Sequence, residues 1–156
     1  MSLHLPRAAS AVLIALTGLI GCDGLFTGES VARFPLTQNA AGGYAPIRVS
    51  LGPDMNPVAL NLHVEYAASA TEAGKWNSYR ATLSKAGTPV KSAEFRVNNT
   101  SDPMSPNAQV VSATMLIVDV AEVADYELAI EATAPIAVTL ANPQLELRKN
   151  IRRAEK

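Results

Sequence analysis

The sequence predicts an all-β domain, an antiparallel β-sandwich of about seven to nine short strands. Apolar and polar residues alternate with a period of two in six segments after residue 33, which is the pattern of half-buried strands. The segments between them are rich in Pro, Gly, Asn and Asp, which favour turns. Helical patterning is limited to two short pieces, residues 67–74 and the residues after Asn150.

The first two predicted strands are residues 47–51 and residues 58–66. In the second of these, the even positions from Val58 to Tyr66 are all apolar, whereas Asn61, His63 and Glu65 occupy odd positions. Because successive side chains leave opposite faces of a strand, the even positions are expected to face a core and the odd positions solvent. Residues 52–57 between the two strands contain two prolines and read as a loop.

Residues 79–83 and 93–97 form the next predicted pair of strands. The sequence Lys85-Ala86-Gly87-Thr88 lies between them and predicts a tight hairpin, with Gly87 supplying a positive φ. Residues 110–120 are apolar at both odd and even positions, which predicts either a central strand covered on both faces or a strand that bends between two sheets. Residues 98–107 form a second loop rich in Asn, Asp and Pro.

The last two predicted strands are residues 126–130 and 145–148. Residues 124–130, with Tyr126 near their start, resemble the penultimate-strand pattern of immunoglobulin-like and jelly-roll modules, in which a tyrosine braces a corner. This resemblance is consistent with both topologies and leaves the choice between them open.

The first 22 residues carry the features of an export signal. Arg7 precedes an apolar run that ends at Ile20, and Gly21 is a small residue at a cleavage position. The apolar run of residues 8–21 is shorter than the about 20 residues that a membrane-spanning helix needs. The tetrapeptide Leu19-Ile20-Gly21-Cys22 resembles the lipobox of bacterial lipoprotein precursors, which are cleaved between the residues that correspond to Gly21 and Cys22.

The lipobox resemblance implies a diacylglycerol and an N-acyl chain on Cys22, and no other cofactor is expected. It also implies a cell-envelope location facing the periplasm, where Asp23 after the cysteine favours the inner membrane over the outer membrane. We therefore expect residues 1–21 to be a signal peptide, residues 22–32 a lipidated tether, and residues 33–156 the β-sandwich domain.

Composition excludes several classes of function. The chain has 13 Lys and Arg against 14 Asp and Glu, a formal net charge of −1, so nothing in its charge indicates nucleic-acid binding. Cys22 is the only cysteine, and His63 is the only histidine after the signal peptide. This composition argues against a zinc site and against Cys–His or Ser–His catalysis, so we predict no metal and no enzymatic activity.

Four groups of residues remain as candidate binding sites. Asn61, His63 and Glu65 share one strand face, although a solvated sheet face is the expectation there. The loop residues Asp54, Asn56, Asn98, Asn99 and Asp102 gather oxygen atoms that could suit calcium, but they are also ordinary turn formers.

The third candidate is aromatic and the fourth is basic. Trp76, with Tyr79 and Tyr44, could form a platform that stacks on a sugar, or Trp76 could instead cap the core. The basic residues near the C-terminus could contact anionic lipid, dock on an acidic partner, or remain a solvated tail. They are Arg148, Lys149, Arg152, Arg153 and Lys156.

These observations predict a lipid-anchored periplasmic module that binds rather than catalyses. The first expected role is protein–protein interaction in an envelope complex, or an inhibitor or immunity-type role, with strand edges and end loops as contact surfaces. The alternative is a carbohydrate-binding or peptidoglycan-binding module that uses Trp76. The expected partners are the membrane, through the anchor, and an envelope protein, and the sequence leaves the oligomeric state undetermined.

Overall fold

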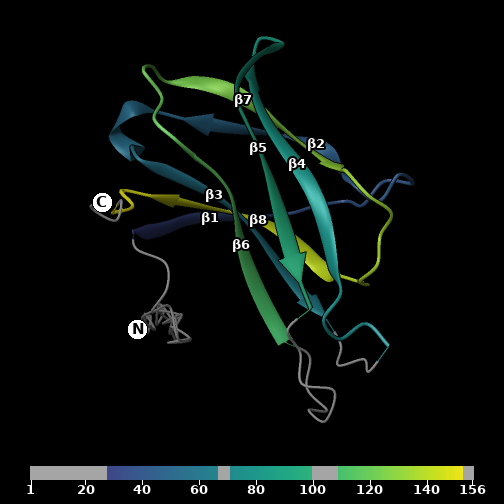
Figure 1. Ribbon diagram of the computed structural model, residues 1–156. Coiled ribbons are helices and arrows are strands. Elements are labelled where there is room, and N and C mark those ends of the chain that lie inside the picture. The colour runs from purple at the N-terminus through teal and green to yellow at the C-terminus, as the bar shows by residue number, and fades with distance from the viewer. Residues whose placement is uncertain (1–27, 67–70, 100–108, 153–156) are drawn as a thin grey trace, which may run out of the picture.

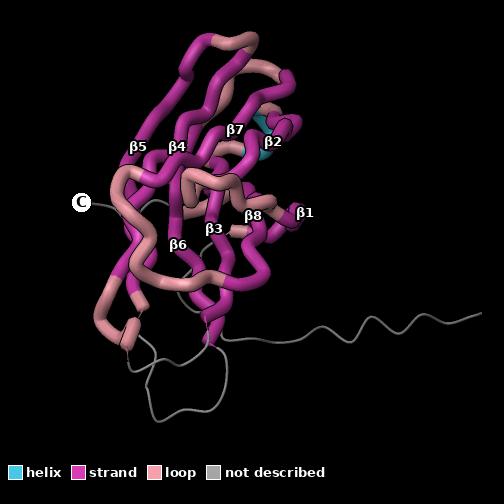
Figure 2. The backbone as a smooth tube through the Cα atoms, turned by 90° about the vertical axis from the view of Figure 1, so that its right-hand side faces the viewer, coloured by secondary structure: helices cyan, strands magenta, loops and turns pink. Residues whose placement is uncertain are grey.

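The computed structural model describes residues 28–66, 71–99 and 109–152. These residues form eight β-strands in two four-stranded antiparallel sheets that pack face to face, as the two layers of Figure 2 show. The all-β sandwich predicted from the alternation of residues is therefore confirmed. The strands are β1 (Glu29–Pro35), β2 (Tyr44–Leu51), β3 (Val58–Tyr66), β4 (Trp76–Lys85), β5 (Thr88–Asn98), β6 (Gln109–Val118), β7 (Ala124–Ala132) and β8 (Ala141–Lys149).

The strand order identifies the topology as a jelly roll. One sheet, sheet A, has the order β1-β8-β3-β6, and the other, sheet B, has the order β2-β7-β4-β5. The first strand therefore pairs with the last, the second with the seventh, the third with the sixth, and the fourth with the fifth. Such nested pairing is that of one long hairpin wrapped into two sheets, which is the jelly-roll arrangement and not the immunoglobulin-like one.

The connections gather at two ends of the sandwich. One end, here called the tether end, holds Gly28, the connections 52–57 and 119–123, the β4–β5 turn and residues 150–152. The opposite end, here called the far end, holds the connections 36–43, 71–75 and 133–140. In Figure 1 the start of β1 and the end of β8 lie on the left, whereas the β1–β2 and β7–β8 connections lie on the right.

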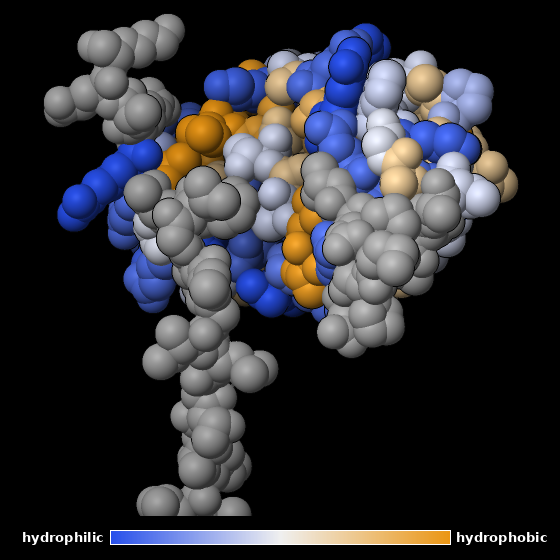
Figure 3. Space-filling model, turned by 60° about the horizontal axis from the view of Figure 1, so that its bottom comes forward, coloured by the Kyte–Doolittle hydropathy of each residue, from blue (hydrophilic) through white to orange (hydrophobic). Residues whose placement is uncertain are grey.

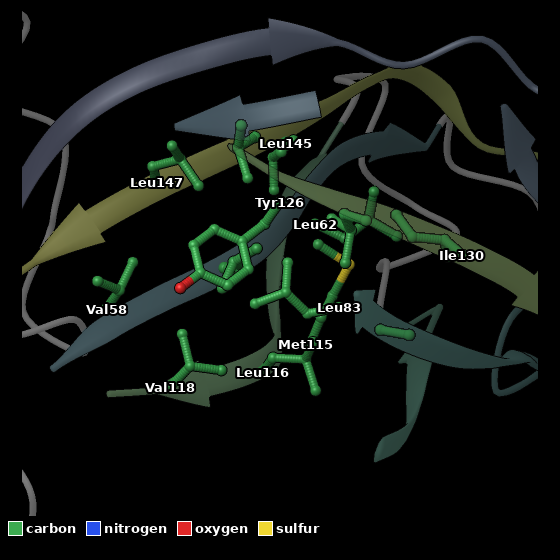
Figure 4. Close-up of a cluster of buried hydrophobic side chains, with 14 of the residues drawn as sticks. Val58, Leu62, Leu83, Met115, Leu116, Val118, Tyr126, Ile130, Leu145 and Leu147 are labelled. Atoms are coloured by element: carbon green, nitrogen blue, oxygen red, sulfur yellow. The ribbon is translucent and has the colours of Figure 1, made fainter. Parts of the chain in front are cut away.

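The core lies between the sheets and follows the predicted alternation. All five apolar residues at even positions of β3 have 0% exposure. Side chains from sheet B, among them Leu83, Tyr126 and Ile130, meet Leu62, Leu145 and Leu147 of sheet A in one cluster (Figure 4). This cluster of apolar side chains is the main source of the free energy that stabilises the fold.

Of the two alternatives predicted for residues 110–120, the central strand covered on both faces is wrong. β6 lies at the edge of sheet A and is not a central strand. The pairing register shifts between Leu60 and Asn61, so that Met115 is an extra residue in β6. Met115 and Leu116 are adjacent and both buried, at 3% and 2% exposure (Figure 4). This β-bulge moves the core-facing side chains from odd to even positions. It explains why the odd and the even positions of this segment are both apolar.

Two further boundaries correct the sequence expectation. β1 begins at Glu29, so the last four residues of the predicted tether, residues 29–32, belong to sheet A. The predicted short helix at residues 67–74 is a turn over residues 71–74, and residues 67–70 lie outside the described part. Residues 151 and 152 after Asn150 are not helical, and residues 153–156 lie outside the described part. The β4–β5 hairpin is confirmed, with positive φ values of 47° at Ala86 and 77° at Gly87.

Candidate functional site

The most exposed aromatic side chain in the described residues is at the far end of sheet B. Trp76 begins β4, pairs with Asn98 at the end of β5, and is 49% exposed. The Arg96 guanidinium carbon lies 5.5 Å from the centroid of the indole ring. This cation–π contact holds both side chains on the outer face of the sheet. Trp76 is therefore exposed, and the alternative in which it caps the core is wrong.

An open hollow of about 520 Å³ is lined in part by Arg96, the residue whose guanidinium lies over the Trp76 ring. Its lining includes Ser78, Glu94, Phe95, Arg96, Thr133 and Ala134. Ser78 follows Trp76 by two residues on the same face of β4, and Arg96 both lines the hollow and covers part of the indole. Glu94 also accepts a hydrogen bond from Arg80 Nη2 at 2.6 Å. The corner thus offers an aromatic ring, a guanidinium, a carboxylate and hydroxyl groups on one surface.

Asn77 fixes the loop beside this corner, because its buried side chain bonds to the backbone of the β7–β8 connection. Its Oδ1 accepts hydrogen bonds from the Ala137 and Val138 N–H groups at 2.8 and 2.9 Å, and its Nδ2 donates to the Val138 carbonyl at 2.8 Å. Asn77 is only 1% exposed. A polar residue buried on the core face is satisfied only by such bonds, so it holds the far end in one conformation.

Tyr79 and Tyr44 are not part of the exposed surface. They are 0% and 2% exposed, and their rings lie 5.9 Å apart in the core. Tyr79 also stacks on Phe95 at 5.4 Å. Burial is the main cause that raises the pKa of Tyr44 well above 10, and the nearby Tyr79 raises it further. Burial also raises the pKa of Tyr79. The predicted set of three contact residues is therefore wrong for the two tyrosines, because β4 and β2 turn them inward.

The face with Asn61, His63 and Glu65 is only partly the solvated face that was expected, since His63 and Glu65 are half-buried but Asn61 is buried. Asn61 is 0% exposed, and its Nδ2 lies 3.5 Å from Oε2 of Glu146. Glu65 accepts a hydrogen bond from Asn142 at 2.8 Å. No group of three or more His, Cys, Asp or Glu side chains within the described residues is arranged to hold a metal ion.

Glu146 is the buried centre of an ion cluster on this outer face of sheet A, in which Arg148 is also buried and Arg33 is half exposed. Glu146 is 2% exposed, and its Oε1 accepts hydrogen bonds from Ser30 Oγ, Arg33 Nη2 and Arg148 Nη1 at 2.9, 3.0 and 3.3 Å. Burial by itself raises the pKa of Glu146, but the hydrogen bonds from Arg33 and Ser30 and the charge of Arg33 outweigh it, and the net pKa lies below 4.5. The cluster joins β1 to β8, because the side chains that donate to Oε1 belong to these two strands. Its role is therefore structural.

The candidate calcium ligands are not brought together. Asp54 and Asn56 lie at the tether end, whereas Asn98 and Asn99 lie at the far end, and Asp102 is outside the described residues. The Asn56 amide is already used, since its Nδ2 donates to the Val120 carbonyl at 2.8 Å and its Oδ1 accepts from the Val120 N–H at 2.9 Å. A single calcium site from these two loops is therefore excluded by the topology.

The basic C-terminal residues divide into different environments. Arg148 is 5% exposed within the Glu146 cluster, and Lys149 forms an ion pair with Glu29 at 3.2 Å. Arg153 and Lys156 lie outside the described residues. The first two residues of the predicted basic tail thus belong to the folded strand β8.

The predicted signal peptide and the lipobox, including Gly21 and Cys22, also lie outside the described residues. In the described residues, no helix has the length and apolar character needed to cross a membrane.

Sequence reasoning missed Asn77 and Glu146 because alternation gives the face of a residue but not what covers it. Glu146 lies between Leu145 and Leu147, so its alternation indicates the outer face of the sheet but not that Arg33 and Arg148 cover it there. Asn77 carries a signal in its parity, since it shares the core-facing positions of β4 with Tyr79, Ala81 and Leu83.

Comparisons with known proteins assign no family to the chain. No family model matches the chain, and no curated protein matches it. Among solved structures, the chain is similar to a family GH115 4-O-methyl-α-glucuronidase with specificity for decorated arabinogalactans, with a TM-score of 0.35 and 13% identity over 93% of this chain and 19% of that chain. It is also similar to the Eiger TNF from S. frugiperda, with a TM-score of 0.34 and 15% identity over 84% of this chain and 92% of that one. At this level of similarity, neither structure indicates a function.

Proposed function

We propose that the protein is a lipid-anchored recognition module that faces the periplasm from the inner membrane and has no catalytic role of its own. The lipobox supports acylation at Cys22, and residues 22–28 can span at most roughly 20 Å. The tether end would then face the bilayer, and the far end would face away from it. The observation that carries the proposal is Trp76, which is 49% exposed at the far end.

The first proposed partner is an envelope protein that docks on the far end. Ile136, 39% exposed, lies on the same end as Trp76, and Asn77 holds the loop that contains Ile136 in place. Figure 3 brings the bottom of Figure 1 forward and shows small apolar areas among hydrophilic side chains, a mixture found at many protein interfaces. An inhibitor or immunity-type role would use the same surface.

Site-specific crosslinking in cells tests this partner. A photo-crosslinking amino acid is placed at Trp76 and, as the matched control, at Val123, which is 73% exposed at the tether end. We expect one adduct of defined mass from position 76, absent from position 123 and lost after Ile136→Asp. Equal adducts from both positions would contradict docking at the far end.

The anchor is tested by metabolic labelling with radioactive palmitate. The wild-type chain is expected to be labelled and to sediment with membranes, and Cys22→Ser is expected to lose both properties. A Cys22→Ser chain that remains labelled would exclude Cys22 as the modified residue.

A second candidate function, carbohydrate or peptidoglycan binding, is favoured by one observation. Trp76 presents part of its ring next to Arg96, and Arg96 lines a hollow together with residues that carry hydroxyl and carboxylate groups, as a sugar-binding surface requires. Retention on peptidoglycan that is lost in Trp76→Ala would support this candidate, and unchanged retention would remove it.

A further inference from the structure

Unlike three other arginines of the two sheets, Arg96 has no carboxylate partner among the described residues. Arg33 and Arg148 pair with Glu146, and Arg80 pairs with Glu94. Within the described residues, no carboxylate lies within salt-bridge distance of the Arg96 guanidinium. The guanidinium makes a cation–π contact with the ring of Trp76. The hydrogen-bond donors of Arg96 therefore remain available on an exposed surface.

The position of Arg96 suits a ligand that carries a carboxylate. The indole ring limits where the guanidinium can lie, and a guanidinium binds a carboxylate through two parallel hydrogen bonds. The hollow of about 520 Å³ next to it carries the Ser78 and Thr133 hydroxyls and the Glu94 carboxylate, which can bind sugar hydroxyl groups. These groups lie on the outward face of β4 and β5 and at the end of β7.

We propose that the corner formed by Trp76, Arg96 and the adjoining hollow binds a sugar that carries a carboxylate. The sugar ring lies against the exposed part of the indole, the carboxylate pairs with Arg96, and the ring hydroxyls point into the hollow. This inference rests on the second candidate function above and narrows it to acidic sugars.

The test compares two sugars that differ in one acidic substituent. N-acetylmuramic acid carries a lactyl carboxylate that N-acetylglucosamine lacks. Trp76 is the only tryptophan of the chain, so a single indole N–H signal in the NMR spectrum of the full chain in detergent micelles reports on this corner. We expect N-acetylmuramic acid to shift that signal saturably, with an affinity about tenfold higher than that of N-acetylglucosamine.

Matched variants identify the arginine responsible. Arg96→Gln should reduce the two affinities to the same value, and Arg96→Lys, which keeps the charge but loses the fork of donors, should give an intermediate preference. Arg48→Gln is the control, because Arg48 is an exposed arginine of sheet B that lines a different hollow and also has no described carboxylate partner. Arg48→Gln should leave the preference unchanged.

Three outcomes would overturn the inference, and they are distinguishable. Equal affinities for the two sugars would refute the carboxylate preference while leaving carbohydrate binding in place. No shift with either sugar would refute the inference together with the carbohydrate candidate, whereas the crosslinking experiment tests the protein partner separately. A blocked diglutamate peptide that shifts the indole signal at lower concentration than N-acetylmuramic acid would assign the corner to acidic peptides instead.

Discussion

Arg33 on β1 donates a hydrogen bond from Nη2 to Oε1 of Glu146 on β8 over 3.0 Å, although the two residues are 113 positions apart in the chain. Arg148 approaches the same carboxylate oxygen at 3.3 Å. β1 lies at the edge of sheet A and pairs only with β8, so this ion cluster adds side-chain bonds to its one backbone ladder. The strand next to the predicted tether is thereby held in the sheet.

Replacing Glu146 by alanine is expected to destabilise the domain strongly. The change leaves Arg148, whose side chain is 6% exposed, without its carboxylate partner, and removal of one partner of a buried ion pair costs about 3 kcal/mol. Denaturation with urea, followed by circular dichroism, measures the loss in free energy of unfolding. Glu94→Ala is the control, because the Arg80–Glu94 pair is exposed and its loss should cost less than about 1 kcal/mol. Equal losses in the two variants would contradict the structural role of Glu146.

The lowered pKa of Glu146 predicts that the free energy of unfolding depends on pH in the acidic range. Hydrogen bonds in the cluster lower the pKa of Glu146 in the folded state below 4.5, its ordinary value. Its contribution is therefore fully present above pH 4.5 and is lost as the pH falls from there through the lowered pKa. We expect the unfolding free energy of the wild type to fall more steeply below pH 4.5 than that of Glu146→Gln, which has no proton to take up at this position. Parallel curves for the two chains would show that Glu146 does not contribute.

Asn77→Ala is expected to destabilise the domain and to loosen the β7–β8 connection. The variant removes three hydrogen bonds to the backbone at Ala137 and Val138 and leaves buried groups of Val138 without partners, at a cost of about 2 kcal/mol. Hydrogen exchange should quicken at the Val138 amide more than at amides of β3. Asn98→Ala, at an exposed position of β5, is the control and should change neither quantity.

The β4–β5 hairpin predicts a stabilising substitution. Ala86 has a φ of 47°, a left-handed conformation that is unfavourable for alanine, and it precedes Gly87 with a φ of 77°. Two positive φ values in sequence are those of a type I′ turn, for which Asn-Gly is preferred. Ala86→Asn should raise the free energy of unfolding by about 0.5–1 kcal/mol. Ala121→Asn, at an exposed position with an ordinary φ, should leave it unchanged, and a loss of stability in Ala86→Asn would contradict this account of the turn.

The sequence was sufficient for the parts of the fold that depend on local alternation. β3 shows this most clearly, because the period-two pattern from Val58 to Tyr66 correctly predicted which side chains enter the core. β6 shows where prediction from alternation fails. The bulge at Met115 changes which parity faces the core within one strand, so the sequence has the same apolar pattern as a strand buried on both faces. The nested strand pairing that defines the jelly roll depends on contacts between distant residues, which periodicity does not encode.

The candidate site was predictable only in part, for a related physical reason. Trp76 and Tyr79 are three positions apart, so the two lie on opposite faces of β4, and the apolar Ala81 and Leu83 at the parity of Tyr79 already indicate that Tyr79 faces the core. The contact between Trp76 and Arg96 joins two strands and required the register of β4 with β5. The burial of Glu146 likewise depends on Arg33, which lies on the neighbouring strand.

Trp76 itself provides the last prediction, which separates a contact residue from a core residue. A tryptophan that is 49% exposed should be quenched readily by acrylamide and should emit at the wavelength of a hydrated indole. Trp76→Ala should lower the free energy of unfolding by less than about 1 kcal/mol, because surface side chains contribute little to stability. Tyr79→Ala is the matched comparison on the same strand, since Tyr79 is 0% exposed and its loss should cost about 3 kcal/mol or more. A shielded, blue-shifted indole together with a large loss of stability in Trp76→Ala would show that Trp76 supports the core, and the far end would then lose the residue on which its proposed recognition role depends.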